Sequence, residues 1–158
     1  KIYKILKDYG QVKKANEIAN KIVSYRKIKP IKSTADLVKV VEDSINKFSR
    51  YKTLAKIFQS IRIEVNDELE VIKQLLLQAS DLIEVKGRIV CISYHSLEDR
   101  LIKNFIRSGS FDNNYNRDFF GNIKKPFQKI GGLVMPEGEE INKNKKARSA
   151  RMRIAEKI

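Results

Sequence analysis

Apolar residues recur every three or four positions through the first part of the chain, which predicts a series of amphipathic helices. The first covers residues 1–9 and the second covers residues 11–27. Pro30 disfavours helix at the residue before it, and Ser33 or Thr34 is placed to cap a third helix. The pattern therefore predicts a small helical unit.

A longer apolar stripe follows, from residue 53 to residue 83. Its steps of three and four indicate one long helix or two helices in series. We expect a kink or a restart near Asn66, because the segment N-D-E-L-E interrupts the stripe. Asp67 and Glu70 have the spacing of a capping box at that point.

The pattern changes after Gly87. A nearly continuous apolar run from Ile89 to Ile92 favours a strand that is buried on both faces, as in a parallel α/β sheet. Residues 96–107 return to helical spacing, and residues 125–134 and 149–158 predict two further strands.

Two polar connections separate these elements. Residues 135–146 are predicted to be mostly irregular. The loop of residues 108–122 is rich in Gly, Ser and Asn but carries four aromatic residues, Phe111, Tyr115, Phe119 and Phe120. Such side chains stack on RNA bases in some proteins and more often anchor a long loop to the body, and both interpretations stay open.

Charge and composition narrow the class of protein. The formal net charge is +14, from 33 Lys and Arg against 19 Asp and Glu, so nucleic acid is the default partner and a solvated lysine-rich surface is the alternative. No apolar run approaches the roughly 20 residues of a membrane span. The start shows no signal-peptide pattern, and the single Cys91 allows neither an internal disulfide nor a metal site built on several cysteines. We expect a cytoplasmic protein without a metal or a membrane partner.

The first candidate site is the segment S-Y-H-S-L-E-D-R, residues 93–100, which holds the only histidine, His95. Ligands of open α/β sheets bind beyond the carboxyl ends of strands, and this segment follows a predicted strand. His95 and Arg100 are therefore candidate pocket residues, although a lone histidine is more often structural. Ser96 and Asp99 have capping-box spacing and are expected to hold the strand-to-helix turn.

A second polar group lies beside the apolar stripe of the long helix. Gln59, Arg62 and Asn66 fall within one narrow helical stripe. Polar residues in such a position are usually solvated or hold a helix junction. A guanidinium and two amides also suit contacts with RNA phosphates or bases.

The densest basic run is N-K-N-K-K-A-R-S-A-R-M-R, residues 142–153, whose candidate RNA contacts are Lys145, Lys146, Arg148 and Arg151. Arg151 and Arg153 would share one face of the last strand. The alternative is a solvated strand edge that blocks aggregation.

One feature of a cofactor-binding α/β domain is missing from the sequence. A Rossmann-like enzyme holds its cofactor with a glycine-rich turn between a strand and a helix, and no such turn occurs here. These patterns alone predict half of an α/β domain.

Four segments, residues 9–41, 58–72, 87–106 and 146–158, occur in the order of one known family. The chain closely resembles the C-terminal part of the RsmH/MraW family, with S-Y-H-S-L-E-D-R and A-R-S-A-R-M-R-I-A-E-K as its most specific motifs. Members of that family are bacterial methyltransferases that use S-adenosylmethionine to methylate the exocyclic N4 of one cytidine in small-subunit (16S) ribosomal RNA.

The resemblance implies a class I (Rossmann-like) methyltransferase fold with an inserted helical domain. Residues 1–64 would be most of the insert, and residues 65–158 would be the C-terminal half of the methyltransferase domain. S-adenosylmethionine would be the cofactor of the parent protein, with no cofactor-binding residue in this chain, which is expected to be inactive alone. The implied partners are 16S rRNA and the small ribosomal subunit, and a homodimer is left open.

The substrate or RNA-binding candidates share polar or basic side chains at the three places described above; they are Gln59, Arg62, Asn66, His95, Arg100, Lys145, Lys146, Arg148 and Arg151. His95 is the candidate catalytic residue. Two alternatives remain, a non-catalytic RNA-binding module and a purely structural or interaction domain. An upstream extension of the reading frame into a glycine-rich strand–turn–helix would separate the enzyme from both alternatives.

Overall fold

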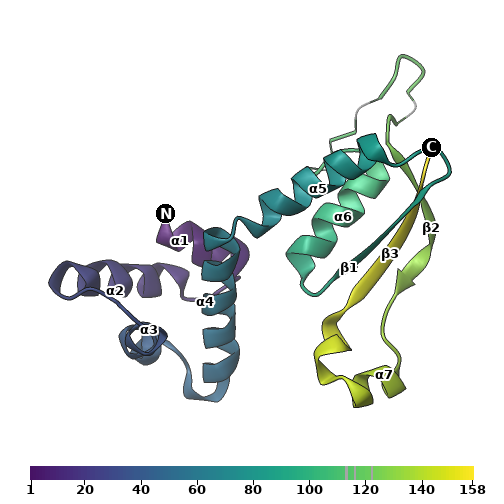
Figure 1. Cartoon of the computed structure of the whole chain (residues 1–158). Coiled ribbons are helices and arrows are strands. Elements are labelled where there is room, and N and C mark those ends of the chain that lie inside the picture. Colours follow the sequence, from purple (N-terminus) through teal and green to yellow (C-terminus); the bar gives the residue numbers. More distant parts are fainter. Residues whose placement is uncertain (113, 116, 122) are drawn as a thin grey trace. The chain divides into compact units, whose positions relative to one another are not determined.

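The computed structural model describes residues 1–112, 114–115, 117–121 and 123–158 (Figure 1). The chain divides into two compact units, Lys1–Glu68 and Leu69–Ile158. The division falls close to the boundary predicted after residue 64, while the assignment of the first unit to an inserted domain stays a prediction. No helix in the described part has both the length and the apolar character needed to cross a membrane.

The first unit is entirely helical, as the apolar pattern predicts. Its elements are α1 (Ile2–Lys4), which continues as a π-helical segment (Ile5–Tyr9), α2 (Ala15–Ile28), α3 (Thr34–Val41), two short 3-10 helices (Glu42–Ser44 and Lys47–Ser49) and α4 (Arg50–Val65). Leu6, Ile18, Val41 and Ile57 lie at the centre of its apolar core. The core therefore joins all the main helices of this unit.

Ser33 caps α3, which confirms one of the two predicted capping residues. Its Oγ accepts a hydrogen bond from the backbone N–H of Asp36 at 3.1 Å, and Asp36 Oδ2 accepts one from the Ser33 N–H at 3.0 Å. This reciprocal capping box satisfies two backbone donors that the first turn of a helix leaves without partners.

The predicted break near Asn66 is also confirmed. Asn66 is the C-cap of α4, and α5 (Glu68–Leu82) begins two positions later. Asp67 has a φ of +52°, in the left-handed region that ends a helix. Glu70, which was expected to cap with Asp67, instead forms an ion pair with Lys73 at 3.1 Å.

The second unit contains a three-stranded antiparallel sheet in the order β1–β3–β2. The strands are β1 (Arg88–Ser93), β2 (Phe127–Val134) and β3 (Arg151–Lys157). After α5, the helices of this unit are α6 (Ser96–Ser108), α7 (Gly138–Lys143) and a 3-10 helix (Lys145–Ser149). The three predicted strands are confirmed. The prediction of a mostly irregular connection before β3 is wrong, because two short helices occupy most of it.

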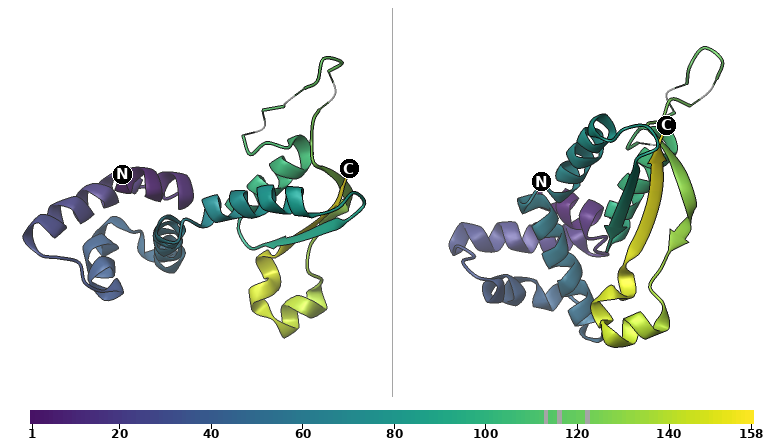
Figure 2. Two further views of the ribbon diagram at one scale, coloured as in Figure 1. Left: turned by 45° about the horizontal axis from the view of Figure 1, so that its top comes forward. Right: turned by 45° about the vertical axis from the view of Figure 1, so that its right-hand side comes forward.

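One face of this sheet is covered by α5 and α6 (Figures 1 and 2). The apolar core between the helices and the sheet is formed by Leu76, Ile102, Phe105, Ile106, Phe127 and Ala155. Cys91 packs against this core, and its burial raises the pKa of the thiol.

The prediction that β1 is buried on both faces is not met in this chain. Burial alternates along β1, and Val90 and Ile92 are 55% and 58% exposed. Strand pairing is antiparallel among the described strands, with Val90 opposite Ile154. The apolar run thus makes a strand as predicted, but its second face is not covered by the described part of the chain.

Candidate functional site

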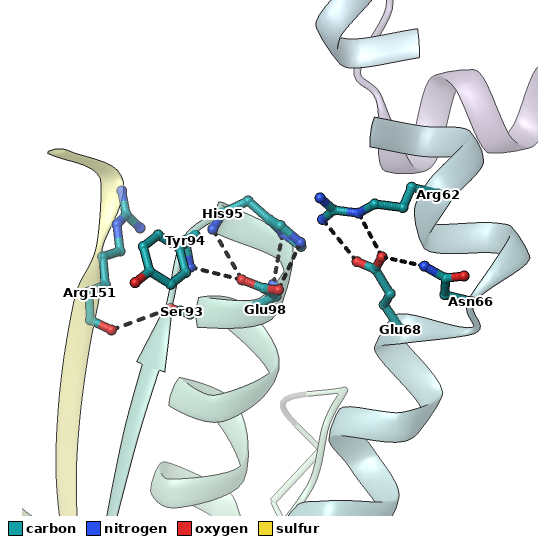
Figure 3. A network of polar contacts seen from close by, with 8 residues as sticks. All are labelled: Arg62, Asn66, Glu68, Ser93, Tyr94, His95, Glu98 and Arg151. Atoms are coloured by element: carbon teal, nitrogen blue, oxygen red, sulfur yellow. Dashed lines mark hydrogen bonds and ion pairs between the residues drawn. The ribbon is translucent and has the colours of Figure 1, made fainter. Parts of the chain in front are cut away.

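The turn from β1 into α6 is held by His95 and Glu98 (Figure 3). His95 Nδ1 accepts a hydrogen bond from the Glu98 N–H at 3.4 Å. Glu98 Oε2 accepts hydrogen bonds from the N–H groups of Tyr94 at 2.9 Å and of His95 at 3.2 Å. The prediction that Ser96 and Asp99 form this capping box is therefore wrong by one residue.

The carboxylate of Glu98 is strongly stabilised at this turn. Burial raises its pKa, but the contact with the His95 side chain and the hydrogen bond from the Tyr94 N–H outweigh burial and lower the pKa to about 2. His95 Nε2 lies 3.1 Å from Glu98 Oε1 without the angle of a hydrogen bond, and the His95 side chain is 13% exposed. The imidazole is thus held at the end of β1 by its role as the N-cap of α6, which the sequence analysis did not predict.

Asp99 links α6 to the last strand. Its Oδ1 accepts a hydrogen bond from Arg153 Nε at 2.6 Å, and its Oδ2 accepts from Arg153 Nη2 and Arg151 Nη1, each at 3.1 Å. The side chain of Asp99 is 8% exposed. Burial raises the pKa of Asp99, but the two guanidinium groups outweigh burial and lower it. We call Asp99, Arg151 and Arg153 the carboxylate–arginine cluster.

Arg151 and Arg153 share one face of β3, as predicted, because they lie opposite Ser93 and Cys91 of β1. Arg151, a candidate RNA contact, is held by Asp99 but remains partly exposed, and its carbonyl accepts a hydrogen bond from Ser93 Oγ at 3.5 Å. Arg100, the other candidate near this turn, lies exposed on α6. The cluster therefore has a structural role, and RNA contact by Arg151 and Arg100 stays a prediction.

In the first unit, Arg62 and Asn66 converge on Glu68 (Figure 3). Glu68 Oε1 accepts hydrogen bonds from Arg62 Nε at 2.7 Å and Asn66 Nδ2 at 3.3 Å, and Glu68 Oε2 accepts from Arg62 Nη2 at 3.1 Å. Gln59 is half-buried on α4. The group holds the helix junction, one of the two roles that the sequence left open. Glu68 itself was missed, although an acid directly after the predicted break was the available signal.

The basic run divides between a helical turn, which carries Lys145, Lys146 and Arg148, and the central strand β3, which carries Arg151 and Arg153. Lys145, Lys146 and Arg148 are exposed on the 3-10 helix before β3, while Ala147 between them is buried. Asn144 caps this turn, because its Oδ1 accepts a hydrogen bond from the Lys146 N–H at 3.1 Å. The turn therefore projects three cations into solvent around one apolar anchor.

The aromatic loop residues separate into two groups. Phe111 stacks on Phe105 of α6, with ring centroids 5.0 Å apart, and so anchors the loop. Phe119 and Phe120 are 99% and 85% exposed and contact each other edge to face. The anchoring interpretation thus describes Phe111, and the stacking interpretation remains a prediction for Tyr115, Phe119 and Phe120.

Glycines in the described residues do not form a cofactor cradle. The three with positive φ are Gly109 at the end of α6, Gly121 in the loop and Gly131 within β2. The strand-to-helix turn between β1 and α6 is made by His95 and Glu98 instead. This part of the chain therefore does not fit a nucleotide-like cofactor in the manner of a glycine-rich turn.

Comparisons with known proteins place the chain among methyltransferases. It belongs to the MraW methylase family, whose family model matches residues 1–158. This match confirms the resemblance that the sequence motifs indicated.

The relatives carry one name. The chain is 48% identical over 151 residues to a protein of Flavobacterium johnsoniae named ribosomal RNA small subunit methyltransferase H, covering 96% of this chain and 50% of that protein. A protein of the same name from Cytophaga hutchinsonii is 44% identical over 156 residues, with 99% and 52% covered. The chain spans about half the length of the curated relatives it matches.

Proposed function

We propose that the protein containing this chain methylates the exocyclic N4 of a cytidine in 16S rRNA, with S-adenosylmethionine as methyl donor. The observation that carries this proposal is the family match over residues 1–158, together with relatives named as small-subunit rRNA methyltransferases. The net charge of +14 supports an RNA substrate. Such a substrate would also place the protein in the cytoplasm, as the sequence predicts.

The second unit would be the C-terminal half of a class I methyltransferase domain, and the first unit its inserted helical domain. The bare face of the sheet supports this assignment, because Val90 and Ile92 are apolar and more than half exposed. Apolar strand faces of this kind are normally covered in α/β domains. The remaining half of the whole protein would cover this face and extend the sheet beyond β1.

The chemistry defines what the chain must contribute. The cytosine amine is a poor nucleophile because its lone pair is delocalised into the ring, so catalysis depends on positioning the nitrogen and removing a proton. The cytidine would first have to leave its stack, which requires a firm hold on the flanking RNA. Exposed basic side chains of this chain, such as Lys145, Lys146 and Arg148, would supply part of that hold.

His95 suits a positioning role better than a base. When its Nδ1 accepts the hydrogen bond from the Glu98 N–H, the neutral ring carries its proton on Nε2. That tautomer has no further lone pair with which to accept a proton from substrate. We therefore propose that His95, with Arg100, borders the substrate pocket and orients its neighbours, while another group accepts the proton.

The cofactor would be held by the other half of the whole protein, because the described residues lack a suitable cradle. We expect calorimetric titration with S-adenosylmethionine to give no measurable complex with this chain, and a one-to-one complex with the whole protein. The whole protein should also transfer a labelled methyl group to 16S rRNA, with N4-methylcytidine as the product in mass spectrometry.

Circular dichroism should first show that the chain is folded in that titration. A one-to-one complex of the folded chain at micromolar affinity would contradict the assignment of the cofactor site. RNA binding without methyl transfer by the whole protein would instead favour the non-catalytic RNA-binding module.

The basic turn before β3 is expected to contact RNA phosphates. Replacing Lys145, Lys146 and Arg148 with alanine in the whole protein should weaken RNA binding with little dependence on sequence. Each lost phosphate contact should make the slope of log K against log salt less negative by about 0.7–0.9. Fluorescence anisotropy with a labelled 16S rRNA fragment over a range of salt concentrations measures both effects.

Lys73→Ala is the control, because this substitution removes a lysine that is already paired with Glu70. Its salt slope should stay close to that of the unmodified protein. If the triple variant keeps the same slope as the control, the turn is only a solvated surface.

A further inference from the structure

A cavity of 290 Å³ lies in the second unit between α6, β2 and β3. Ile106 forms an apolar part of its wall, and Gly132 contributes backbone only. Ile154 also lines the cavity, but it lies opposite Val90, so its side chain belongs to the other face of the sheet. The other lining residues are all cationic: Lys103, Arg107, Lys125, Lys129 and Arg153. None of the described residues that line it is acidic. We call it the α6–β2 cavity.

The positive charge of this cavity is only partly neutralised by the nearest acid on α6. Asp99 binds Arg153, but it also binds Arg151, so one carboxylate serves two guanidinium groups. Arg107 also lines the cavity, and its guanidinium lies 5.6 Å over the ring of Tyr115. A concave surface lined by one sign of charge concentrates the field and attracts an anion.

The backbone of β2 keeps the cavity open. The register between β2 and β3 shifts between Ile130 and Val134, and Gly131 has a φ of +64° within this irregularity. A β-carbon built on Gly132 would meet no atom within 4 Å. The bulge therefore places a residue without a side chain at the cavity wall.

We propose that the α6–β2 cavity binds a backbone phosphate of the RNA substrate, with the adjoining sugar against Ile106. The proposal rests on the function proposed above and adds a contact away from the β1–α6 turn. Lys103 follows His95 by about two helical turns, or roughly 12 Å along α6 at 1.5 Å per residue. An anchor at that distance would hold flanking RNA while a flipped cytidine occupies the reaction pocket.

Two adjacent lysines give a matched test of the proposal. Lys125 lines the cavity, whereas Lys124 is exposed beside it and does not line it. Lys125→Glu and Lys124→Glu change the net charge of the whole protein equally. We expect Lys125→Glu to weaken binding of a labelled 16S rRNA fragment at least fivefold more than Lys124→Glu. For this variant, the slope of log K against log salt should become less negative by about 0.7–0.9, as expected for one lost phosphate contact.

A second pair adds a carboxylate without removing a cation. Gly132→Glu places the acid at the cavity wall, and Gly138→Glu places it at the start of α7, where a β-carbon also meets no atom within 4 Å. Only Gly132→Glu should weaken RNA binding several-fold, and thermal melting should show that both variants are folded. A site for free phosphate alone would leave the members of each pair equal in RNA binding and would overturn the proposal.

Methyl transfer by the unmodified whole protein separates the two proposals. If that protein methylates 16S rRNA but the paired variants bind RNA equally, the cavity assignment is wrong and the function stands. If the pairs differ in RNA binding but no methyl group is transferred, the cavity assignment stands and the proposed function is wrong.

Discussion

Asp99→Ala is expected to lower the free energy of unfolding of this chain by about 3–5 kcal/mol, the usual loss when one partner of a buried ion pair is removed. Arg153, whose side chain is 14% exposed, would keep its charge with no carboxylate at its guanidinium. Arg151 is more exposed and can reach water. The loss should therefore come mainly from Arg153, and urea denaturation measures it.

A more exposed ion pair, between β1 and β3, provides the control. Arg88 and Glu156 are joined at 3.2 Å on the surface, so Glu156→Ala should change the free energy of unfolding by less than about 1 kcal/mol. The double variant Asp99→Leu with Arg153→Met should recover much of the lost stability, because it removes both buried charges. If Asp99→Ala is no more destabilising than Glu156→Ala, the carboxylate–arginine cluster is not a buried pair in solution.

Acid should remove the same contribution. The pKa of Asp99 lies below its unfolded value of about 3.9, so its stabilising effect is fully present above that value. The effect is lost as pH falls through the lowered pKa of the folded state. The difference in stability between the unmodified chain and Asp99→Ala should therefore shrink only in strongly acidic solution.

Local patterns explain what the sequence predicted correctly. The capping residue Ser33 and the break near Asn66 depend on neighbours within a few residues along the chain. The shared face of Arg151 and Arg153 follows from the two-residue period of a strand. The first strand was likewise visible as a short apolar run that follows Gly87.

The wrong predictions have two causes. In one case the local spacing allowed two different capping boxes, and in the others the outcome depends on residues far away in the sequence. The pairs His95/Glu98 and Ser96/Asp99 both have the spacing of a capping box. The backbone decides between them, because it stays extended through His95, with φ −135° and ψ 161°. Asp99 on α6 is then available to bind Arg151 and Arg153 of β3, which lie more than 50 residues further along the chain.

The exposure of Val90 and Ile92 has a similar cause. Their apolar character predicts burial on both faces, but burial depends on elements that pack against the strand from elsewhere. The α6–β2 cavity could not be predicted either, because its cations are scattered from Lys103 to Arg153. Only the fold brings them to one wall, whereas the basic run before β3 is already contiguous in the sequence.

His95→Asn in the whole protein is expected to reduce methyl transfer at least roughly tenfold, about 1.4 kcal/mol of transition-state stabilisation, with little change in melting temperature. Asparagine is a good N-cap, so it can replace the acceptor that His95 Nδ1 offers to the Glu98 N–H. It cannot replace the imidazole ring, which lies after the end of β1 and contacts the Glu98 carboxylate. The variant thus separates the pocket role from the cap.

Three matched variants complete this test. His95→Ala should lose turnover and also about 1 kcal/mol of stability, because alanine cannot cap the helix. Glu98→Ala should lower stability by removing the acceptor for two backbone N–H groups, those of Tyr94 and His95. Ser96→Ala should change neither property strongly, because Ser96 is the first residue of α6 and not its cap.

Turnover is measured per folded molecule, with the folded fraction taken from thermal melting. If His95→Asn keeps turnover within about twofold of the unmodified protein while His95→Ala loses only stability, His95 is a helix cap and not a pocket residue.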